Sequence, residues 1–324
     1  MSEQSEFSLI QRYFERLTSP RDDVLLGIGD DCALLQCPAD HVIAVSIDTL
    51  VEGVHFFADV SPETLGHKSL AVGLSDLAAM GATPAWFTLA LSLPDVNELW
   101  LQGFSQGLAK LAQQHNIHLV GGDTTRGPLT ISIQVHGFVK AEKALRRNGA
   151  KLGDMIYVTG TLGDAGVALQ QKLNQWADDS LSDADNAFFQ QRLEQPTPRN
   201  NIGQGLVDFA TSAIDISDGL LADLGHILAK SKVGARLDLS KLPLSSSMAK
   251  IARKEVEQFA LQSGDDYELC FTVPPHYVAE MEQQFQGLCT QIGIITDDDG
   301  LYCLNENDEL IDLTGAETGY DHFK

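Results

Sequence analysis

The chain carries Gly27-Ile28-Gly29-Asp30-Asp31, in which two glycines are followed at once by two acids. A glycine-rich loop commonly binds phosphate through its backbone N–H groups, but adjacent carboxylates repel phosphate. A hard divalent cation resolves this conflict because it binds the oxygens of carboxylates and phosphates alike. The stretch therefore leads to the hypothesis of a metal site, which the other acids of the chain can support or weaken.

The bulk composition narrows the class of protein. A length of 324 residues predicts two domains, and 44% hydrophobic with 21% charged residues is typical of a soluble globular protein. The 45 acids against 22 bases give a formal charge of −23, which argues against binding of nucleic acid through a basic face. The acidity either serves solubility or includes acids that converge on metal.

The cysteines and the N-terminus indicate the cellular compartment. Five cysteines, at positions 32, 37, 270, 289 and 303, form no CxxC motif and predict reduced thiols, with a Cys32–Cys37 pair as the alternative. The first six residues are acidic and lack the apolar core of a signal peptide, and no apolar run has membrane-spanning length. We therefore expect a cytoplasmic protein without a membrane partner.

Hydrophobic periodicity predicts an α+β fold for the first half. Ser61-Pro62-Glu63-Thr64 is typical of a helix start, and that helix is expected to run to Met80 and stop at Gly81. A strand over 42–47 is expected to end at Asp48, and a strand over 117–120 to run into Gly121-Gly122-Asp123. The remaining predicted elements are helices over 7–17 and 97–114 and strands over 85–93 and 129–139.

The composition turns basic and polar around residues 141–149, which include Arg146 and Arg147. We place a domain boundary there and predict domains over 1–147 and 148–324. The second domain is predicted to contain another β/α series. Its elements are a strand over 155–159, helices near 164–173, 184–193 and 199–210, a strand from 213 that enters a helix ending near 230, and strands over 267–273 and 292–296.

Several common motifs are absent. The glycine–acid loop lacks the third glycine of a dinucleotide fingerprint, and no P-loop or protein-kinase motif is present. Asp297-Asp298-Asp299-Gly300 lacks the closing glutamate of a calcium loop and is interpreted as a solvated turn. The nine histidines form no HExxH pair, and only His55, which follows the Asp48 segment, is a candidate; a structural role is its alternative.

One pattern recurs in the acids: an aspartate stands at a strand end or turn, beside glycine or a small hydroxyl residue. It occurs at Gly29-Asp30-Asp31, Ser46-Ile47-Asp48-Thr49, Gly122-Asp123-Thr124 and Asp215-Ile216-Ser217-Asp218-Gly219. Each alone is explained by capping or turn formation, for example by Ser217 or Asp218 capping the next helix. Asp76 is predicted near a helix C-terminus, where the dipole disfavours a carboxylate, so either solvation or metal binding would explain it.

These motifs, in this order along the chain, resemble those of the thiamine-monophosphate kinases of the aminoimidazole-ribonucleotide-synthetase-like superfamily. The similar stretches also include Asp48-Thr49-Leu50-Val51-Glu52-Gly53-Val54-His55-Phe56, Leu74-Ser75-Asp76-Leu77-Ala78-Ala79-Met80-Gly81-Ala82, Asp266-Tyr267-Glu268-Leu269 and Gly319-Tyr320-Asp321-His322-Phe323. The resemblance implies an α+β, two-domain fold with an N-terminal α/β dimerisation domain and a C-terminal α/β domain that completes the active-site cleft. It also implies a homodimer joined through the N-terminal domains.

The implied activity is ATP-dependent phosphorylation of thiamine monophosphate to thiamine diphosphate, the last step of thiamine diphosphate biosynthesis. The implied ligands of several Mg²⁺ ions are Asp30, Ser46, Ile47 (through its main-chain oxygen), Asp48, Asp76, Asp123, Asp215 and Asp218. The implied ATP contacts are Gly122, Asp123, Arg147 and Ser217, and the implied substrate contacts are His55, Asp265 and Tyr320. At Asp265 the family pattern has glutamate, which is one methylene longer, so the contact there is expected to run through a bridging water.

This chemistry needs no general base, because a phosphate monoester loses its second proton near pH ~6 and its oxygen is already anionic. Catalysis then consists of in-line positioning and charge neutralisation. Two rival functions stay open. One is another ATP-using superfamily member, such as an aminoimidazole-ribonucleotide synthetase or a selenophosphate synthetase; the latter expects a reactive cysteine near an N-terminal glycine loop, and Cys32 lies near such a loop but in a different motif. The other is a non-catalytic, acidic metal-binding protein.

Overall fold

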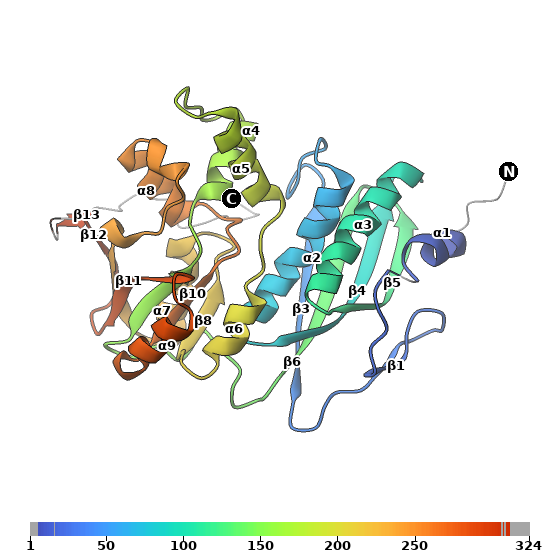
Figure 1. Ribbon diagram of the computed structural model, residues 1–324, viewed down its shortest axis with the longest axis horizontal. Coiled ribbons are helices and arrows are strands. Elements are labelled where there is room, and N and C mark those ends of the chain that lie inside the picture. The colour runs from blue at the N-terminus through green and yellow to red at the C-terminus, as the bar shows by residue number, and fades with distance from the viewer. Residues whose placement is uncertain (1–5, 16, 306, 308, 312–324) are drawn as a thin grey trace. The chain divides into compact units, whose positions relative to one another are not determined.

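The structure is a computed structural model that describes residues 6–15, 17–305, 307 and 309–311 (Figure 1). The chain divides into two compact units. The first consists of Met1–Leu77 with Ala82–Glu142, and the second of Ala78–Gly81 with Lys143–Lys324. Among the described residues, no helix is both long and apolar enough to cross a membrane. All five cysteines are free thiols, as predicted.

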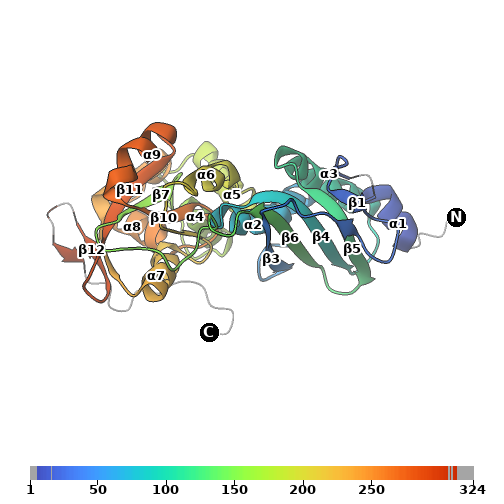
Figure 2. The same ribbon diagram turned by 90° about the horizontal axis from the view of Figure 1, so that it is seen from below.

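The first unit is built on a four-stranded sheet in the order β3-β6-β4-β5. The strands are β3 (Val42–Val51), β6 (Thr130–Val139), β4 (Thr83–Leu93) and β5 (His118–Arg126). Only the β4–β5 pair is parallel. The helices α2 (Pro62–Ala79) and α3 (Glu98–Gln114) cover one face of this sheet (Figures 1 and 2), and α1 (Glu6–Tyr13) lies near β5. A small sheet, β1 (Val24–Leu26) with β2 (Leu34–Leu35), precedes β3.

The packing of this unit follows from apolar periodicity and from glycines at close contacts. Six residues of α3 are buried, at the spacing of one helix face, and Asn97 caps this helix by accepting a hydrogen bond from the Trp100 N–H. A Cβ on Gly107 would lie 1.8 Å from the carbonyl oxygen of Glu63, so only glycine lets α3 approach α2 this closely. The two helices therefore form one rigid layer over the sheet.

The second unit is built on a seven-stranded sheet in the order β13-β12-β9-β11-β7-β10-β8, in which only β12–β9 is parallel. The strands are β7 (Met155–Thr159), β8 (Ser212–Asp215), β9 (Gly234–Asp238), β10 (Leu269–Val273), β11 (Cys289–Thr296), β12 (Leu301–Leu304) and β13 (Leu310–Ile311). The helices are α4 (Asp164–Lys172), α5 (Asp183–Glu194), α6 (Asn200–Leu206), α7 (Leu220–Ser231), α8 (Arg253–Gln262) and α9 (Val278–Gln284). Three short 3₁₀ helices span Leu239–Lys241, Met248–Lys250 and Pro275–Tyr277.

Strand alternation gives this sheet an apolar core on each face. Ile156 and Val158 of β7 pack in one cluster with α7, whereas Tyr157 packs in another with α6 and α9. The sheet is therefore covered on both faces, as in the expected α+β architecture.

The predicted elements are confirmed where local signals are strong, and two strands are longer than expected. The helix predicted from Ser61-Pro62 is α2, and the strand predicted over 155–159 is β7. The prediction that Asp48 ends its strand is wrong, because β3 continues to Val51 along ten paired positions of β6. Likewise, Gly121-Gly122-Asp123 lies within β5, since this stretch pairs with β4.

Candidate active site

A pocket of about 510 Å³ lies beside the glycine–acid loop in the first unit. Its lining includes the loop residues 27–33, the β5 residues 119–124, and Ile10 and Phe14 of the N-terminal segment. Three predicted site residues, Asp30, Gly122 and Asp123, therefore line one pocket. Asp30 Oδ1 accepts a hydrogen bond from the Asp31 N–H (2.9 Å), so Asp31 shapes the turn by its backbone.

Gly122 has a structural reason to be glycine. A Cβ at this position would lie 1.9 Å from the carbonyl oxygen of Leu89, its partner on the neighbouring strand β4. A side chain would therefore push β5 away from β4. This constraint accounts for the glycine without a phosphate, so its contact with ATP stays a prediction.

A second group of predicted ligands lies between β3 and α2. The Ser46 hydroxyl donates a short hydrogen bond to Asp76 Oδ2. Asp48 Oδ2 is buried and accepts no hydrogen bond from the described residues. Burial, and secondarily the neighbouring Asp76 carboxylate, raises the pKa of Asp48 to about 7. Among the described residues, no basic group lowers this pKa. The negative charge of the two carboxyls and the buried Asp48 Oδ2, which accepts no hydrogen bond from the described residues, therefore suit a cation.

The backbone of Ile47 lies between these acids, on β3. Its side chain is 63% exposed, because strand alternation turns it to the face of the sheet opposite Ser46 and Asp48. The side chain therefore does not contribute to the pair, and metal binding by the main-chain oxygen of Ile47 stays a prediction.

The two acidic groups of the first unit do not converge. Asp48 of one group lies on β3 and Asp123 of the other lies on β5, and these strands are opposite edges of the four-stranded sheet, three strand spacings or about 14 Å apart. The row across the sheet runs from Asp48 to Ile133, Leu89 and Gly122. Within the described ranges, no three His, Cys, Asp or Glu side chains are placed to hold a single metal ion.

His55 lies in the segment between β3 and α2. Its Nδ1 accepts a hydrogen bond from the Val51 N–H (3.1 Å), so the neutral ring carries its proton on Nε2. The ring is half-buried and held by its own loop. The structure thus provides an oriented imidazole at the predicted substrate contact.

In the second unit, Asp215 ends β8 as predicted and is buried. The N–H groups of the next loop residues, Ser217, Asp218 and Gly219, all donate to Asp223 Oδ2, at 3.0, 3.0 and 3.1 Å. The alternative explanation of Ser217 and Asp218, that one of them caps the following helix, is therefore wrong: α7 begins after Gly219 without a side-chain cap.

Asp223 is the residue that sequence reasoning missed. Burial raises the pKa of its carboxyl to about 6, although the three N–H donors oppose this shift. Its signal in the sequence was an acid in the first turn of a predicted helix, directly after a glycine-containing loop. It acts on the loop as a positioning residue, because it fixes the backbone of Ser217 and Asp218.

The loop before β10 lies against the loop that Asp223 holds. The N–H of Asp265 donates to the Ser217 carbonyl (2.9 Å), and the N–H of Tyr267 donates to the Ile216 carbonyl (2.8 Å). Asp265 itself has φ +66, a left-handed conformation that aspartate tolerates better than most residues. Three predicted site residues of this unit, Ser217, Asp218 and Asp265, are therefore brought together.

The two remaining predicted residues are Arg147 and Tyr320. Arg147 is exposed in the second unit, and its carbonyl oxygen accepts a hydrogen bond from the Ser231 hydroxyl (3.0 Å). Tyr320 lies outside the described residues. Their roles stay predictions.

Comparison with known proteins defines the class. Residues 29–139 match the family "AIR synthase related protein, N-terminal domain", and residues 151–304 match "AIR synthase related protein, C-terminal domain". Fold and motifs therefore define a two-domain protein of the AIR synthase related class.

The relatives within this class specify the family. Thiamine-monophosphate kinase of Escherichia coli (strain K12) is 51% identical over 324 residues, which cover 98% of each chain. The crystal structure of thiamine-monophosphate kinase from Stenotrophomonas maltophilia K279a has a TM-score of 0.81 and 46% identity, covering 92% of this chain and 94% of that one. The chain belongs to the thiamine-monophosphate kinase family. A further structure, AaThiL complexed with AMPPCP and TMP, has a TM-score of 0.76 and 30% identity, covering 91% and 92%.

Proposed function

We propose that this chain transfers the γ-phosphoryl group of ATP to thiamine monophosphate and so forms thiamine diphosphate. The observation that carries this proposal is the 51% identity over 98% of both chains with the E. coli thiamine-monophosphate kinase. The related structure in complex with AMPPCP and TMP supports the use of ATP. Such identity over the full length favours this activity over that of a selenophosphate synthetase or a passive metal-binding protein.

The acids between β3 and α2 support a role for Mg²⁺. Asp48 Oδ2 is buried without a hydrogen-bond donor among the described residues, beside the Asp76 carboxylate. Oxygen-rich sites of this kind fit Mg²⁺, which when bound neutralises charge on carboxylates and phosphates. The proposed ligands are those that the resemblance implies: Asp30, Ser46, Ile47 by its main-chain oxygen, Asp48, Asp76, Asp123, Asp215 and Asp218.

The other proposed contacts position the two phosphate-bearing substrates. Gly122, Asp123, Arg147 and Ser217 are proposed to contact ATP, and His55, Asp265 and Tyr320 to contact thiamine monophosphate. The acceptor phosphate is already a dianion above pH ~6, so in-line attack requires orientation rather than proton abstraction. Asp223 supports this role indirectly because it holds the loop of Ser217 by three hydrogen bonds.

We also propose a cytoplasmic homodimer that joins through the first unit. The open face of β3 carries Ile43, Val45 and Ile47, which are 44%, 53% and 63% exposed. An apolar row of this kind on a sheet edge is costly in water and favours a covering partner. Val45→Lys should shift the sedimentation coefficient to that of a monomer. Leu99→Lys, at an exposed apolar residue on α3, should not.

The activity is tested with purified protein, ATP, Mg²⁺ and thiamine monophosphate, with thiamine diphosphate and ADP measured together. Stoichiometric formation of both is expected. ADP without thiamine diphosphate would indicate a different acceptor, and the absence of both from folded protein would reject the kinase. Asp123→Asn should lower kcat by at least about 100-fold without loss of fold. The reason is that it removes a charged ligand from the Mg²⁺ that neutralises the phosphates.

A further inference from the structure

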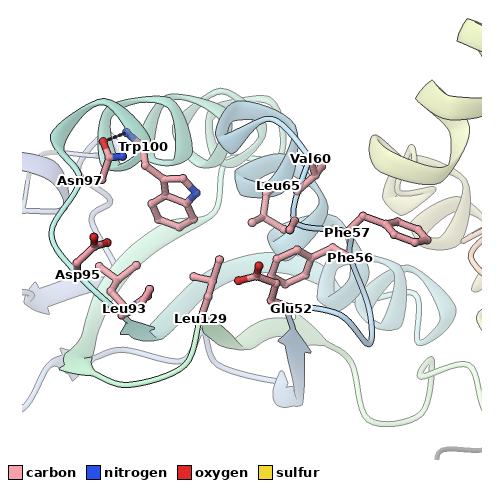
Figure 3. A pocket seen from close by; sticks show the side chains of 12 residues that line it. Glu52, Phe56, Phe57, Val60, Leu65, Leu93, Asp95, Asn97, Trp100 and Leu129 are labelled. Atoms are coloured by element: carbon pink, nitrogen blue, oxygen red, sulfur yellow. Dashed lines mark hydrogen bonds between the residues drawn. The ribbon is translucent and has the colours of Figure 1, made fainter. Parts of the chain in front are cut away.

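Each unit presents a proposed substrate contact on a short loop. In the first unit this contact is His55, which directly precedes Phe56 in the wall of a pocket of about 190 Å³ (Figure 3). In the second unit it is Asp265, in the loop before β10. The ring of His55 is oriented by the Val51 N–H at 3.1 Å. Asp265 requires a comparable support because of its backbone conformation.

The loop before β10 holds two non-glycine residues in the left-handed region, Asp265 at φ +66° and Tyr267 at φ +50°. Aspartate enters this region at moderate cost, but a bulky residue such as tyrosine rarely does. Residues keep such a conformation only where their surroundings impose it, and they cluster at functional sites. The residue between these two, Asp266, is therefore the candidate for the group that imposes it.

Asp266 is buried in the second unit, with 1% of its surface exposed. Its Oδ2 accepts a hydrogen bond from the Gly163 N–H at 2.8 Å, and its Oδ1 is buried without a hydrogen-bond partner among the described residues. The N–H groups of its two neighbours, Asp265 and Tyr267, donate at 2.9 and 2.8 Å to carbonyls of the loop that contains Ser217. One residue therefore binds inward and its neighbours bind to an adjacent loop, which fixes the backbone of all three.

The partner of Asp266 lies in a glycine-rich segment, residues 160–166, which runs from the end of β7 into α4. A Cβ on any of its three glycines would clash with the segment 259–268 that leads into β10. The clashes are of Gly160 with Glu268 Oε1 at 2.2 Å, of Gly163 with the Ala260 nitrogen at 2.7 Å, and of Gly166 with Ser263 Oγ at 2.1 Å. The glycines therefore allow the two segments to lie in direct contact.

Three N–H groups of the glycine-rich segment are used within the chain. Those of Gly160 and Leu162 donate to backbone carbonyls at 3.2 and 3.1 Å, and that of Gly163 donates to Asp266. A glycine-rich loop that binds phosphate directs such groups at its ligand instead. The segment is therefore a platform for the loop before β10, and Asp266 is the side chain that attaches the loop to it.

The surroundings of Asp266 favour its uncharged form. Burial raises the pKa of this carboxyl well above its usual range; Asp164 and Glu268 add to the rise, and the Gly163 N–H and Arg192 oppose it. An amide of the same shape can therefore replace the carboxyl with little change in charge. Alanine, in contrast, removes the acceptor of the Gly163 N–H.

We propose that Asp266 is a positioning residue for substrate binding: through its hydrogen bond with Gly163 it holds Asp265 in the conformation in which Asp265 contacts thiamine monophosphate. This inference rests on the proposed kinase function and on the proposed contact of Asp265. Ser217, the proposed ATP contact of the adjacent loop, is held separately by Asp223. Loss of the Asp266 carboxyl therefore weakens the binding of thiamine monophosphate and not that of ATP.

The test compares Asp266→Ala with Asp266→Asn, which keeps an oxygen for the Gly163 N–H. Asp266→Ala should raise both the KM for thiamine monophosphate and its Kd in calorimetric titration about tenfold, the scale of one hydrogen bond. Asp266→Asn should stay within about twofold of the wild type, and the KM for ATP should be unchanged in both variants. If Asp266→Ala does not fold, Asp266→Ser, whose shorter side chain cannot occupy the position of Oδ2, should show the same rise.

A control lowers stability at a distance from the loop. Leu237→Ala removes a fully buried side chain from β9, which β11 and β7 separate from β10. This variant should lower the free energy of unfolding, as cavity-forming variants do, and leave both KM values unchanged. A rise in its KM for thiamine monophosphate as large as that of Asp266→Ala would overturn the positioning role, because lost stability alone would then explain the effect.

A double-mutant cycle tests whether Asp266 acts through Asp265. Asp265→Ala should itself raise the KM for thiamine monophosphate, and adding Asp266→Ala should change it little further. Additive effects, or a wild-type Kd in Asp266→Ala, would overturn the inference while the kinase stands. The same holds if Asp265→Ala binds thiamine monophosphate as the wild type does. If the wild type forms no thiamine diphosphate, the proposed function fails, and this inference fails with it.

Discussion

Asp48 in the first unit and Glu268 in the second both hold carboxylate oxygens away from solvent, but their surroundings differ in charge. Glu268 is fully buried and accepts hydrogen bonds from Arg199 at 2.6 Å through two nitrogens, from Arg192 at 3.0 Å and from Thr159 at 2.6 Å. Asp48 has a second carboxyl, Asp76, as its charged neighbour. Glu268 therefore has basic counterions, whereas no basic group among the described residues affects the pKa of Asp48.

This difference separates a structural acid from a candidate ligand. A buried carboxylate with two guanidinium partners is compensated, and a further cation there would meet two positive charges. A buried carboxylate beside another carboxylate is uncompensated, and an external cation would relieve the repulsion. The Asp266-Tyr267-Glu268-Leu269 motif therefore includes an acid of the core, whereas the Asp48 motif includes an acid that fits a metal ion.

The largest effect is expected when the compensated cluster is broken. Glu268→Gln should lower the free energy of unfolding by about 3–5 kcal/mol, because Arg199 would keep a largely buried charge without its partner and Arg192 would keep only its longer ion pair with Asp164, at 3.7 Å. Urea denaturation measures this change. If the variant is as stable as the wild type, the cluster is not the structural element described above.

Removal of Mg²⁺ tests the uncompensated pair. For wild type, Mg²⁺ at about 100 times its Kd should raise the free energy of unfolding by roughly 2.7 kcal/mol, since it binds the folded chain alone. Asp76→Asn should lose most of this gain and lose activity. Asp31→Asn is the matched control, because Asp31 lies in the glycine–acid loop without an assigned role. An undiminished gain in Asp76→Asn would contradict the assignment of this residue.

The pH dependence of the metal-free protein gives a third comparison. The pKa of Asp48 is raised to about 7 in the folded chain, so between pH ~4 and ~7 the folded state binds more protons than the unfolded state. This carboxyl therefore makes stability fall as the pH rises through that window. Asp48→Asn should remove the fall and be more stable than wild type above pH 7 by about 4 kcal/mol, because each pKa unit corresponds to about 1.4 kcal/mol. Equal pH profiles of the two proteins, measured with a chelator present, would refute this account of the pair.

The parts of the molecule that could be predicted from sequence are those fixed by local interactions. The start of α2 is set by Ser61, whose hydroxyl accepts the Thr64 N–H at 3.1 Å, and the start of α3 is set by Asn97. Both signals lie within three residues of the helix they begin, so the sequence displays them. The superfamily fold was instead implied by the family resemblance, which rests on the order of the aspartate-containing motifs along the chain.

The parts that could not be predicted depend on partners far apart in the chain. Glu268 and Arg199 are separated by 69 positions, and nothing near either residue shows that they meet. The place of β3 and β5 at opposite edges depends on the pairing of β6 with both β3 and β4. For this reason the sequence does not show that the implied ligands of the first unit fall into two groups, one with Asp48 and Asp76 and one with Asp30 and Asp123.

The smallest effect is expected at an ion pair that is complete but exposed. Arg236 and Asp298 lie 3.0 Å apart, and each side chain is 54% exposed, so solvent already screens both charges. Asp298→Asn should change the free energy of unfolding by less than about 0.5 kcal/mol. Asp298 also belongs to the acidic turn that was weighed as a calcium loop, and Ca²⁺ should stabilise wild type and variant equally. If Asp298→Asn lowered the free energy of unfolding as much as Glu268→Gln does, pairing rather than burial would determine how much these ion pairs stabilise the fold. The distinction between Asp48 and Glu268 would then fail.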